Sequence, residues 1–179
     1  MGSLATRAER VITDRAAAYL IDFALLSLGV VLLWIASVVG SVSVGLVAGA
    51  IDSTALLVLG SFLVPALLWT GIGVLVFGYF TFLDGATEGT LGKRVQDLQV
   101  VTEDGGDPTM KHAAIRTAVL MVPFPLMALL GFVGGAFLFV FVLAVMGGWL
   151  LVEAAVLVAG SDGRRLGDKA AGTYVVPNR

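Results

Sequence analysis

Every basic side chain of this chain lies in one of three short polar segments, and the long apolar runs between them contain none. Basic residues that flank membrane spans stay on the cytoplasmic side of the bilayer, so the three segments should share that side. The polar gap 41–53 and the glycine-rich gap 131–135 carry no basic residue and should lie outside. This distribution predicts four spans with both termini in the cytoplasm. The basic residues are Arg7, Arg10, Arg15, Lys93, Arg94, Lys111, Arg116, Arg164, Arg165, Lys169 and Arg179.

The composition supports a membrane protein and argues against several classes of function. Of 179 residues, 58% are hydrophobic and 13% are charged, whereas a soluble domain carries about 25% charged residues. The net charge of -2 and the scattered basic residues argue against a nucleic-acid partner. The chain has no cysteine and one histidine, which excludes thiolate metal sites, cysteine nucleophiles and a Ser–His–acid set. We therefore expect no enzyme activity and no cofactor.

Three apolar stretches are long enough to cross a bilayer, which takes about 20 helical residues for roughly 30 Å of hydrocarbon. The stretch 117–159 contains one charge, Glu153, and is too long for a single span, so two antiparallel spans joined near 131–136 fit better. An alternative makes 119–130 a re-entrant or interfacial segment broken by two prolines, and it would place the basic C-terminus outside. The predicted spans are 16–39, 54–83, 113–133 and 137–160.

The cytosolic segments 84–112 and 161–179 are predicted to contribute a small β element. Residues 95–102 are rich in β-branched side chains and precede a strong turn sequence of Gly, Asp and Pro. Residues 173–176 form a second short β-rich run. We expect these two strands to pair beneath the membrane. The predicted fold is therefore an all-α membrane protein of four spans with a small cytosolic strand pair.

An internal repeat links the two cytosolic segments. Residues 91–101 align with 166–176 at an offset of 75 residues, with four identities in eleven positions. Each copy follows a two-span hairpin that begins inside, so the two hairpins would be parallel and related by an axis along the membrane normal. The alternative is a chance match within an apolar chain of low complexity.

Arg15, Tyr19 and Asp22 follow each other at spacings of four and three residues, which places them on one face of a helix. Asp22 would lie roughly 10 Å below the inner surface at about 1.5 Å of rise per residue. A carboxylate inside the membrane costs roughly 2.5–3.5 kcal/mol and needs a partner or a water-filled cavity. Arg15 can reach inward toward it, and a partner on another helix is equally possible. The site is either a cation or proton site or a structural ion pair.

Glu153 is the second intramembrane acid and lies at roughly the depth of Asp22. Two carboxylates at one depth can share a proton or coordinate a cation. The alternative is a polar side chain that reaches the interface or hydrogen-bonds within the bundle. Asp84 and Glu88 flank the end of the second span and are expected at the interface, as is His112, which has no metal-ligand companion nearby.

The motifs described above, taken in order, resemble the RDD family of small membrane proteins, named for one arginine and two aspartates. Arg15 and Asp22 match the family's arginine and first aspartate, and Asp168 would be its second aspartate. Arg116 resembles a further recurrent arginine of the family, whereas Glu153 matches none of its motifs. The resemblance covers residues 10–176 and rests on three stretches, 90–94, 98–101 and 165–176, with the turn at 104–105.

This resemblance implies a multi-pass protein of the plasma membrane with a transport-related role, and cation–proton exchange is suggested for some members. The expected partners are then the lipid bilayer, Na⁺ or H⁺, and further copies of the chain. The alternative is a scaffold or accessory subunit whose buried charges are structural. The candidate ion-site residues are Arg15, Asp22, Asp168, Glu153, Arg116 and Tyr19.

Overall fold

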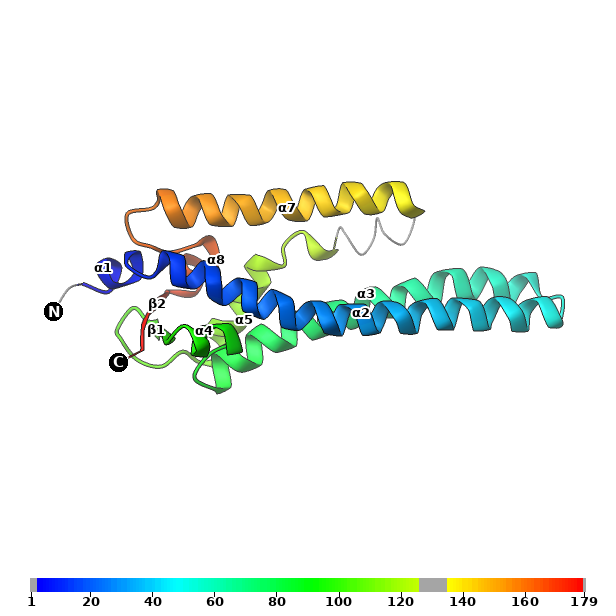
Figure 1. Ribbon diagram of the computed structural model, residues 1–179, viewed down its shortest axis with the longest axis horizontal. Helices are drawn as coiled ribbons and strands as arrows, with labels where there is room; N and C mark the ends of the chain where they lie inside the picture. Colours follow the sequence, from blue (N-terminus) through cyan, green and yellow to red (C-terminus); the bar gives the residue numbers. More distant parts are fainter. Residues whose placement is uncertain (1–2, 126–134, 179) are drawn as a thin grey trace.

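Two long helices dominate the structure, a computed structural model that describes residues 3–125 and 135–178. Helices α2 (Ile12–Ala50) and α3 (Thr54–Ala86) form a hairpin and lie side by side along their length (Figure 1). Only 6% of the most apolar window of each helix is buried. Large apolar side chains that nothing covers, such as Phe23 and Leu46 at 70% exposure, are what a lipid environment accommodates.

Helix α3 agrees with the predicted span 54–83, but α2 continues well beyond the predicted end of its span at residue 39. Residues 41–50 of the polar gap are therefore helical, and the turn between the two helices is confined to Ile51–Ser53. Ser43 does not interrupt the helix because its hydroxyl donates to the carbonyl oxygen of Val39 at 2.8 Å. The side chain of Ser53 accepts a hydrogen bond from the Leu56 N–H and begins α3.

The second half of the chain contains shorter helices. Helix α5 (Met110–Leu120) ends before a turn at 121–123, because Pro123 has no N–H and restricts the residue before it. A continuous helix over 113–133 is therefore not formed. Residues 126–134, with most of the predicted turn at 131–136, lie outside the described residues, and the third crossing stays a prediction. Helix α7 (Gly135–Ala159) covers the predicted fourth span, 137–160.

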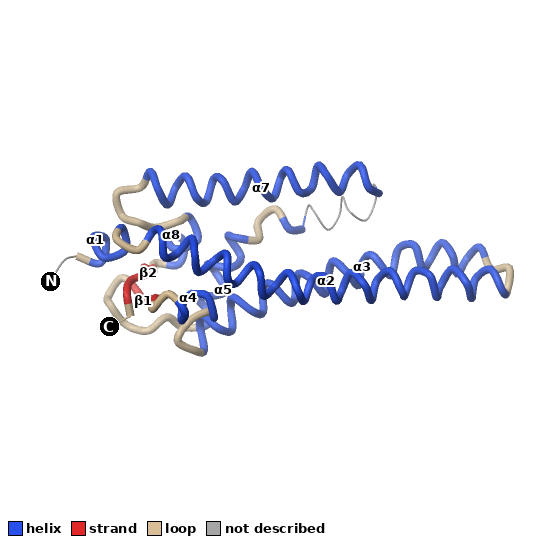
Figure 2. The backbone as a smooth tube through the Cα atoms, in the orientation of Figure 1, coloured by secondary structure: helices blue, strands red, loops and turns tan. Residues whose placement is uncertain are grey.

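The predicted strand pair is confirmed. Strand β1 (Leu98–Thr102) and strand β2 (Thr173–Pro177) are antiparallel, with Val100 opposite Val175. Both strands lie at the end of the molecule that also holds the two termini (Figure 2). The short helices α4 (Leu91–Val95) and α8 (Leu166–Ala171) precede β1 and β2 respectively, so both copies of the sequence repeat form the same helix–strand unit.

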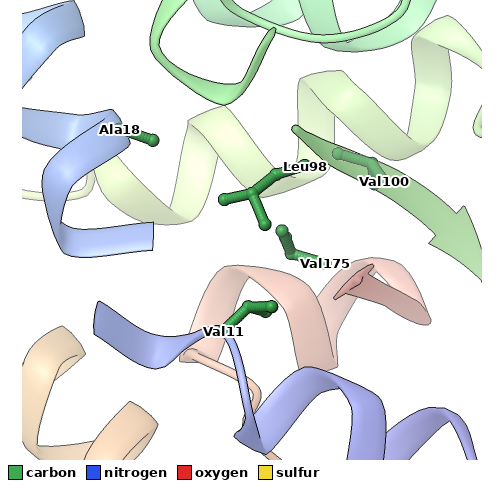
Figure 3. Packing of buried hydrophobic residues seen from close by; sticks show 5 residues of the cluster. All are labelled: Val11, Ala18, Leu98, Val100 and Val175. Atoms are coloured by element: carbon green, nitrogen blue, oxygen red, sulfur yellow. The ribbon is translucent and has the colours of Figure 1, made fainter. Parts of the chain in front are cut away.

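The sheet is held between the first two helices. One face packs Leu98, Val100 and Val175 against Val11 and Ala18 at the start of α2 (Figure 3). The other face, with Val101 and Val176, packs against Ala8 of α1 (Leu4–Glu9). The N-terminus, the central segment and the C-terminus therefore share one small apolar core, and this core sits directly below the buried charges.

Candidate functional site

Eight charged side chains from six helical segments gather at the end of the molecule where the sheet, α4, α5 and α8 lie (Figure 1). None of them is more than 5% exposed. Four are acidic and four are basic, so the charges balance when all are ionised. Because an unpaired buried charge is costly, the pairing among them decides what the cluster can do. They are Arg15, Asp22, Asp84, Lys93, Arg116, Glu153, Arg165 and Asp168.

Asp168 is the centre on which three arginines converge. The Arg15 guanidinium donates a hydrogen bond to one carboxylate oxygen. The Nη2 of Arg116 lies 3.1 Å from the other oxygen, and the Nε of Arg165 lies 3.6 Å from it. Burial alone would raise the pKa of Asp168, but the three guanidinium groups outweigh burial and hold this pKa well below its usual range. Asp168 therefore stays ionised and ties α2 and α5 to α8.

Asp84 is the second acidic centre. The Lys93 Nζ donates to it at 2.5 Å, and the Nη2 of Arg116 lies 3.8 Å from the same carboxylate. Burial lowers the pKa of Lys93 to about 8, against the attraction of Asp84. Lys93 is thus still largely protonated at neutral pH. Since Arg116 also contacts Asp168, it joins the two acidic centres into one network.

Asp22 differs from both of these acids, because among the described residues it forms no ion pair. Its carboxylate is fully buried and accepts three hydrogen bonds. The donors are the Tyr79 hydroxyl at 2.6 Å, the Thr90 hydroxyl at 2.6 Å and the Gly92 N–H at 2.8 Å. Tyr79 belongs to α3, whereas Thr90 and Gly92 begin α4, so one carboxylate of α2 contacts two further elements.

Glycines bring the short helices close enough for these contacts. A β-carbon at Gly92 would overlap the carbonyl oxygen of Ala18 on α2. A β-carbon at Gly167 would lie 2.8 Å from the carbonyl oxygen of Arg116 on α5. The repeated Leu-Gly dipeptide therefore lets α4 lie against α2 and α8 lie against α5. These close approaches bring Thr90 next to Asp22 and Asp168 next to the arginines.

Glu153 is nearly buried, and its carboxylate faces the backbone N–H groups of Leu166 and Gly167 at the start of α8 without a well-aligned hydrogen bond within the described part of the chain. Its charged neighbours are Arg165 and Asp168 of the α8 segment. The Tyr19 hydroxyl is likewise buried without a hydrogen-bond partner, and its ring lies 5.3 Å from the Arg165 guanidinium carbon. Asp22 and Glu153 have neighbours on different elements. Asp22 contacts α3 and α4, whereas Glu153 faces the α8 segment.

All six residues singled out from the sequence belong to or border this cluster, but their pairing differs from the simplest expectation. Arg15 does not contact Asp22; it binds Asp168 and donates to the Gly163 carbonyl oxygen at 2.7 Å. The structure thus agrees with the alternative in which the partners of Asp22 belong to other elements. For Asp22 the partners are neutral donors from α3 and α4.

Sequence reasoning missed several members of the cluster. Asp84 was expected only at the interface, yet it is buried and ion-paired. Lys93 aligns with Asp168 in the sequence repeat, so the repeat itself was the signal that could have found it. Thr90 and Arg165 begin the motif stretches 90–94 and 165–176 and occupy equivalent positions at the repeat offset of 75 residues, so the same signal applied to them. Tyr79 carries no comparable signal, because a single tyrosine is common in such chains.

A pocket of about 380 Å³ opens beside Asp84, between the end of α3, strand β1 and the segment before α5. Its charged lining residues are Asp84, Glu88 and Asp107, and no basic side chain lines it. The described residues contain no group of three acidic, histidine or cysteine side chains placed to hold a metal ion. The pocket thus favours cations through its charge and offers no dedicated metal centre.

A comparison with family models gives a match for most of the chain. Comparisons with curated proteins and with solved structures each gave no match. Residues 10–172 match the model described as the RDD family, and this range includes every member of the buried cluster. Because the match covers most of the chain, the protein belongs to the RDD family of membrane proteins.

Proposed function

We propose that this RDD protein takes part in membrane transport, as a cation–proton exchanger whose ion-responsive group is Asp22. The observation that carries the proposal is the contrast among the buried aspartates. Asp84 and Asp168 are neutralised by basic side chains, whereas Asp22 is fully buried and has none among the described residues. A carboxylate that no fixed cation neutralises is free to exchange a proton for a mobile cation.

The groups around Asp22 suit such an exchange. The Tyr79 and Thr90 hydroxyls donate to the carboxylate in this structure, and a hydroxyl can also accept. A cation bound at Asp22 would therefore meet one carboxylate and two hydroxyl oxygens, which are the ligands that hard cations take. The fixed partner of Arg15 is Asp168, so Arg15 does not compete for this carboxylate.

The proposal includes four spans, cytoplasmic termini and a plasma-membrane location. It is supported by the placement of all basic residues in three segments, which pack around one core here. A path between so few helices favours association of several copies of the chain. In this proposal Na⁺ or H⁺ is the transported species, and the protein has no enzymatic activity.

The test is ion flux in sealed proteoliposomes of purified protein, with a pH-sensitive dye inside and Na⁺, K⁺ or Li⁺ pulses outside. Asp22→Asn keeps the size of the side chain and removes its charge, so we expect the cation-dependent pH change to disappear. Asp52→Asn is the matched control, because Asp52 is exposed in the turn between α2 and α3. Flux that persists in D22N, with both variants folded, would overturn the proposal.

A second candidate function is a membrane scaffold or accessory subunit. The observation that favours it is that Asp22 binds α3 and α4 at once through three hydrogen bonds. In that case the wild-type protein shows no flux, and D22N lowers the melting temperature in detergent while D52N does not. The two measurements together separate the two functions.

A further inference from the structure

Glu153 is the one buried acid that has neither a salt bridge nor a well-aligned hydrogen bond among the residues that the structure describes. It is 5% exposed, and its carboxylate faces the backbone N–H groups of Leu166 and Gly167 at the start of α8 without a well-aligned hydrogen bond to either. Asp22, by contrast, has three donors, and Asp84 and Asp168 have basic partners. Burying an ionised carboxylate without a partner costs much more free energy than burying the neutral acid.

The groups that face Glu153 come from the elements packed around it. From the α8 segment these are the side chains of Arg165 and Asp168 and the backbone N–H groups of Leu166 and Gly167. Asp168 is in turn held by Arg15 of α2 and Arg116 of α5. Residues 117–159 contain no charge other than Glu153 itself.

Arg165 lies between two carboxylates. Its Nε is 3.6 Å from Asp168 and makes no hydrogen bond. Its guanidinium carbon lies 5.3 Å from the ring of Tyr19, whose buried hydroxyl is also without a partner. No salt bridge joins Arg165 to Glu153 in this arrangement. A weakly held guanidinium beside an unpaired acid has two alternative ion-pair partners.

We propose that Glu153 is a proton-binding site separate from Asp22, and that Arg165 responds to its titration by moving between Asp168 and Glu153. The arrangement described here is the protonated one, with Glu153 neutral and Arg165 near Asp168. When Glu153 releases its proton to water, the O–H bond breaks and the electron pair stays on the carboxylate oxygen. The new negative charge then draws Arg165 away from Asp168, which keeps Arg15 and Arg116 as partners.

This proposal concerns proton binding and does not depend on ion flux. It would place a proton-dependent contact between α7 and the α8 unit, the region where α7 meets the rest of the molecule. If the protein exchanges protons, Glu153 would be a second proton carrier beside Asp22. If the protein is a scaffold, the same contact would hold α7 against the α8 unit in a pH-dependent way.

The test is infrared spectroscopy of the protein in liposomes, titrated from about pH 5, which is above the ordinary glutamate pKa of about 4.3, to about pH 9. Wild type should show the carbonyl band of a protonated carboxylic acid that persists at neutral pH. Glu153→Gln, which has the size of the neutral acid, should lose this band, and Glu153→Asp should keep one at a shifted frequency. Glu88→Gln is the control, because Glu88 is exposed. The same band in E153Q, or its absence from wild type, would overturn the proposal.

The response of Arg165 has its own test. Without the guanidinium, the ionised form of Glu153 loses its partner, so Arg165→Gln should move the titration of the band to higher pH by about one unit or more. Arg164→Gln is the matched control, since Arg164 pairs with Glu103 and Asp162 and is partly exposed. Band titration that is the same in R165Q as in wild type would show that Arg165 does not respond to Glu153. Because D22N should keep the Glu153 band, failure of this proposal is distinguishable from failure of the flux experiment.

Discussion

Asp168 is the residue on which the stability of the charged cluster depends most. Three guanidinium groups lie within 3.6 Å of its carboxylate, and neither Asp168 nor its three partners is more than 5% exposed. Asp168→Asn removes the negative charge with which these three buried arginines pair. We expect the free energy of unfolding to fall by about 3–5 kcal/mol, the range for breaking a buried ion pair by removing one partner. Chemical and thermal unfolding in detergent measure the change.

Asp162→Asn is the control for that variant. Asp162 pairs with Arg164 and Lys169, but about a quarter of its side chain is exposed, so its loss should cost less than about 1 kcal/mol. The pKa of Asp168 is lowered in the folded protein, so its stabilising effect is present above pH 4 and declines as the pH falls further. The difference between wild type and D168N should therefore shrink in acid. Equal unfolding of D168N and D162N at neutral pH would contradict the central role of Asp168.

At this scale the sequence predicted which residues matter better than it predicted their partners. The spacing of Arg15 and Asp22 predicts that both lie near the start of one helix, and both belong to the first part of α2. It says nothing of a partner 153 positions away, because that contact depends on how α8 folds back onto α2. Glu153 was found as a lone charge in an apolar run, yet its neighbour Arg165 could be identified only from the packing of α8.

At the scale of elements, the glycines of the repeated Leu-Gly dipeptide set how closely α4 and α8 approach the longer helices. Gly92→Ala places a methyl group against the carbonyl oxygen of Ala18, which belongs to the backbone and cannot turn aside. Helix α4 must then move away from α2 and lengthen the hydrogen bond from Gly92 to Asp22. We expect a loss of about 1–3 kcal/mol, the usual cost of overpacking, measured by unfolding in detergent.

Gly78→Ala is the matched control, because a β-carbon at Gly78 in α3 meets nothing within 4 Å. Alanine is also the better helix former, so this variant should be as stable as wild type or slightly more stable. If G92A is as stable as G78A, the close approach of α4 to α2 is not required. In that event the hydrogen bonds of Asp22 would form even when α4 lies further from α2.

The elements themselves were largely predictable where a local pattern decides the structure. The strand pair followed from two β-branched runs, and α3 and α7 followed from uninterrupted apolar sequence. The end of α2 was not predictable from polarity, because serine can bond within its own helix, as Ser43 does with Val39. The early end of α5 reflects Pro123, which a count of apolar residues overlooks.

At the scale of the whole molecule, the strand pair restricts the topology. Strands β1 and β2 are hydrogen-bonded neighbours and must lie on the same side of the membrane. The chain between them therefore crosses an even number of times. Because Ala8 packs on Val176, the N-terminus lies on that side as well. An odd number of crossings, as in the reading that places the C-terminus outside, would separate the two strands.

The length of α2 adds a further constraint. Its 39 residues extend for roughly 58 Å at about 1.5 Å per residue, nearly twice the hydrocarbon thickness of about 30 Å. One end of α2 is occupied by the charged cluster and the sheet, so the surplus length is shared between that end and the end at the hairpin turn, or absorbed by tilt. The turn at Ile51–Ser53 should then reach the membrane surface opposite both termini.

This topology can be tested directly because the chain has no cysteine of its own. Single cysteines at Ala50→Cys, Asp107→Cys and Asn178→Cys occupy exposed positions in the α2–α3 turn region, the central segment and the C-terminus. In intact cells or right-side-out vesicles, a membrane-impermeant maleimide should label A50C, and it should label D107C and N178C only after permeabilisation. Labelling of N178C from outside while D107C stays protected would contradict the four-span topology. It would also mean that β1 and β2 do not pair in the membrane, since no chain can keep paired strands on opposite sides of a bilayer.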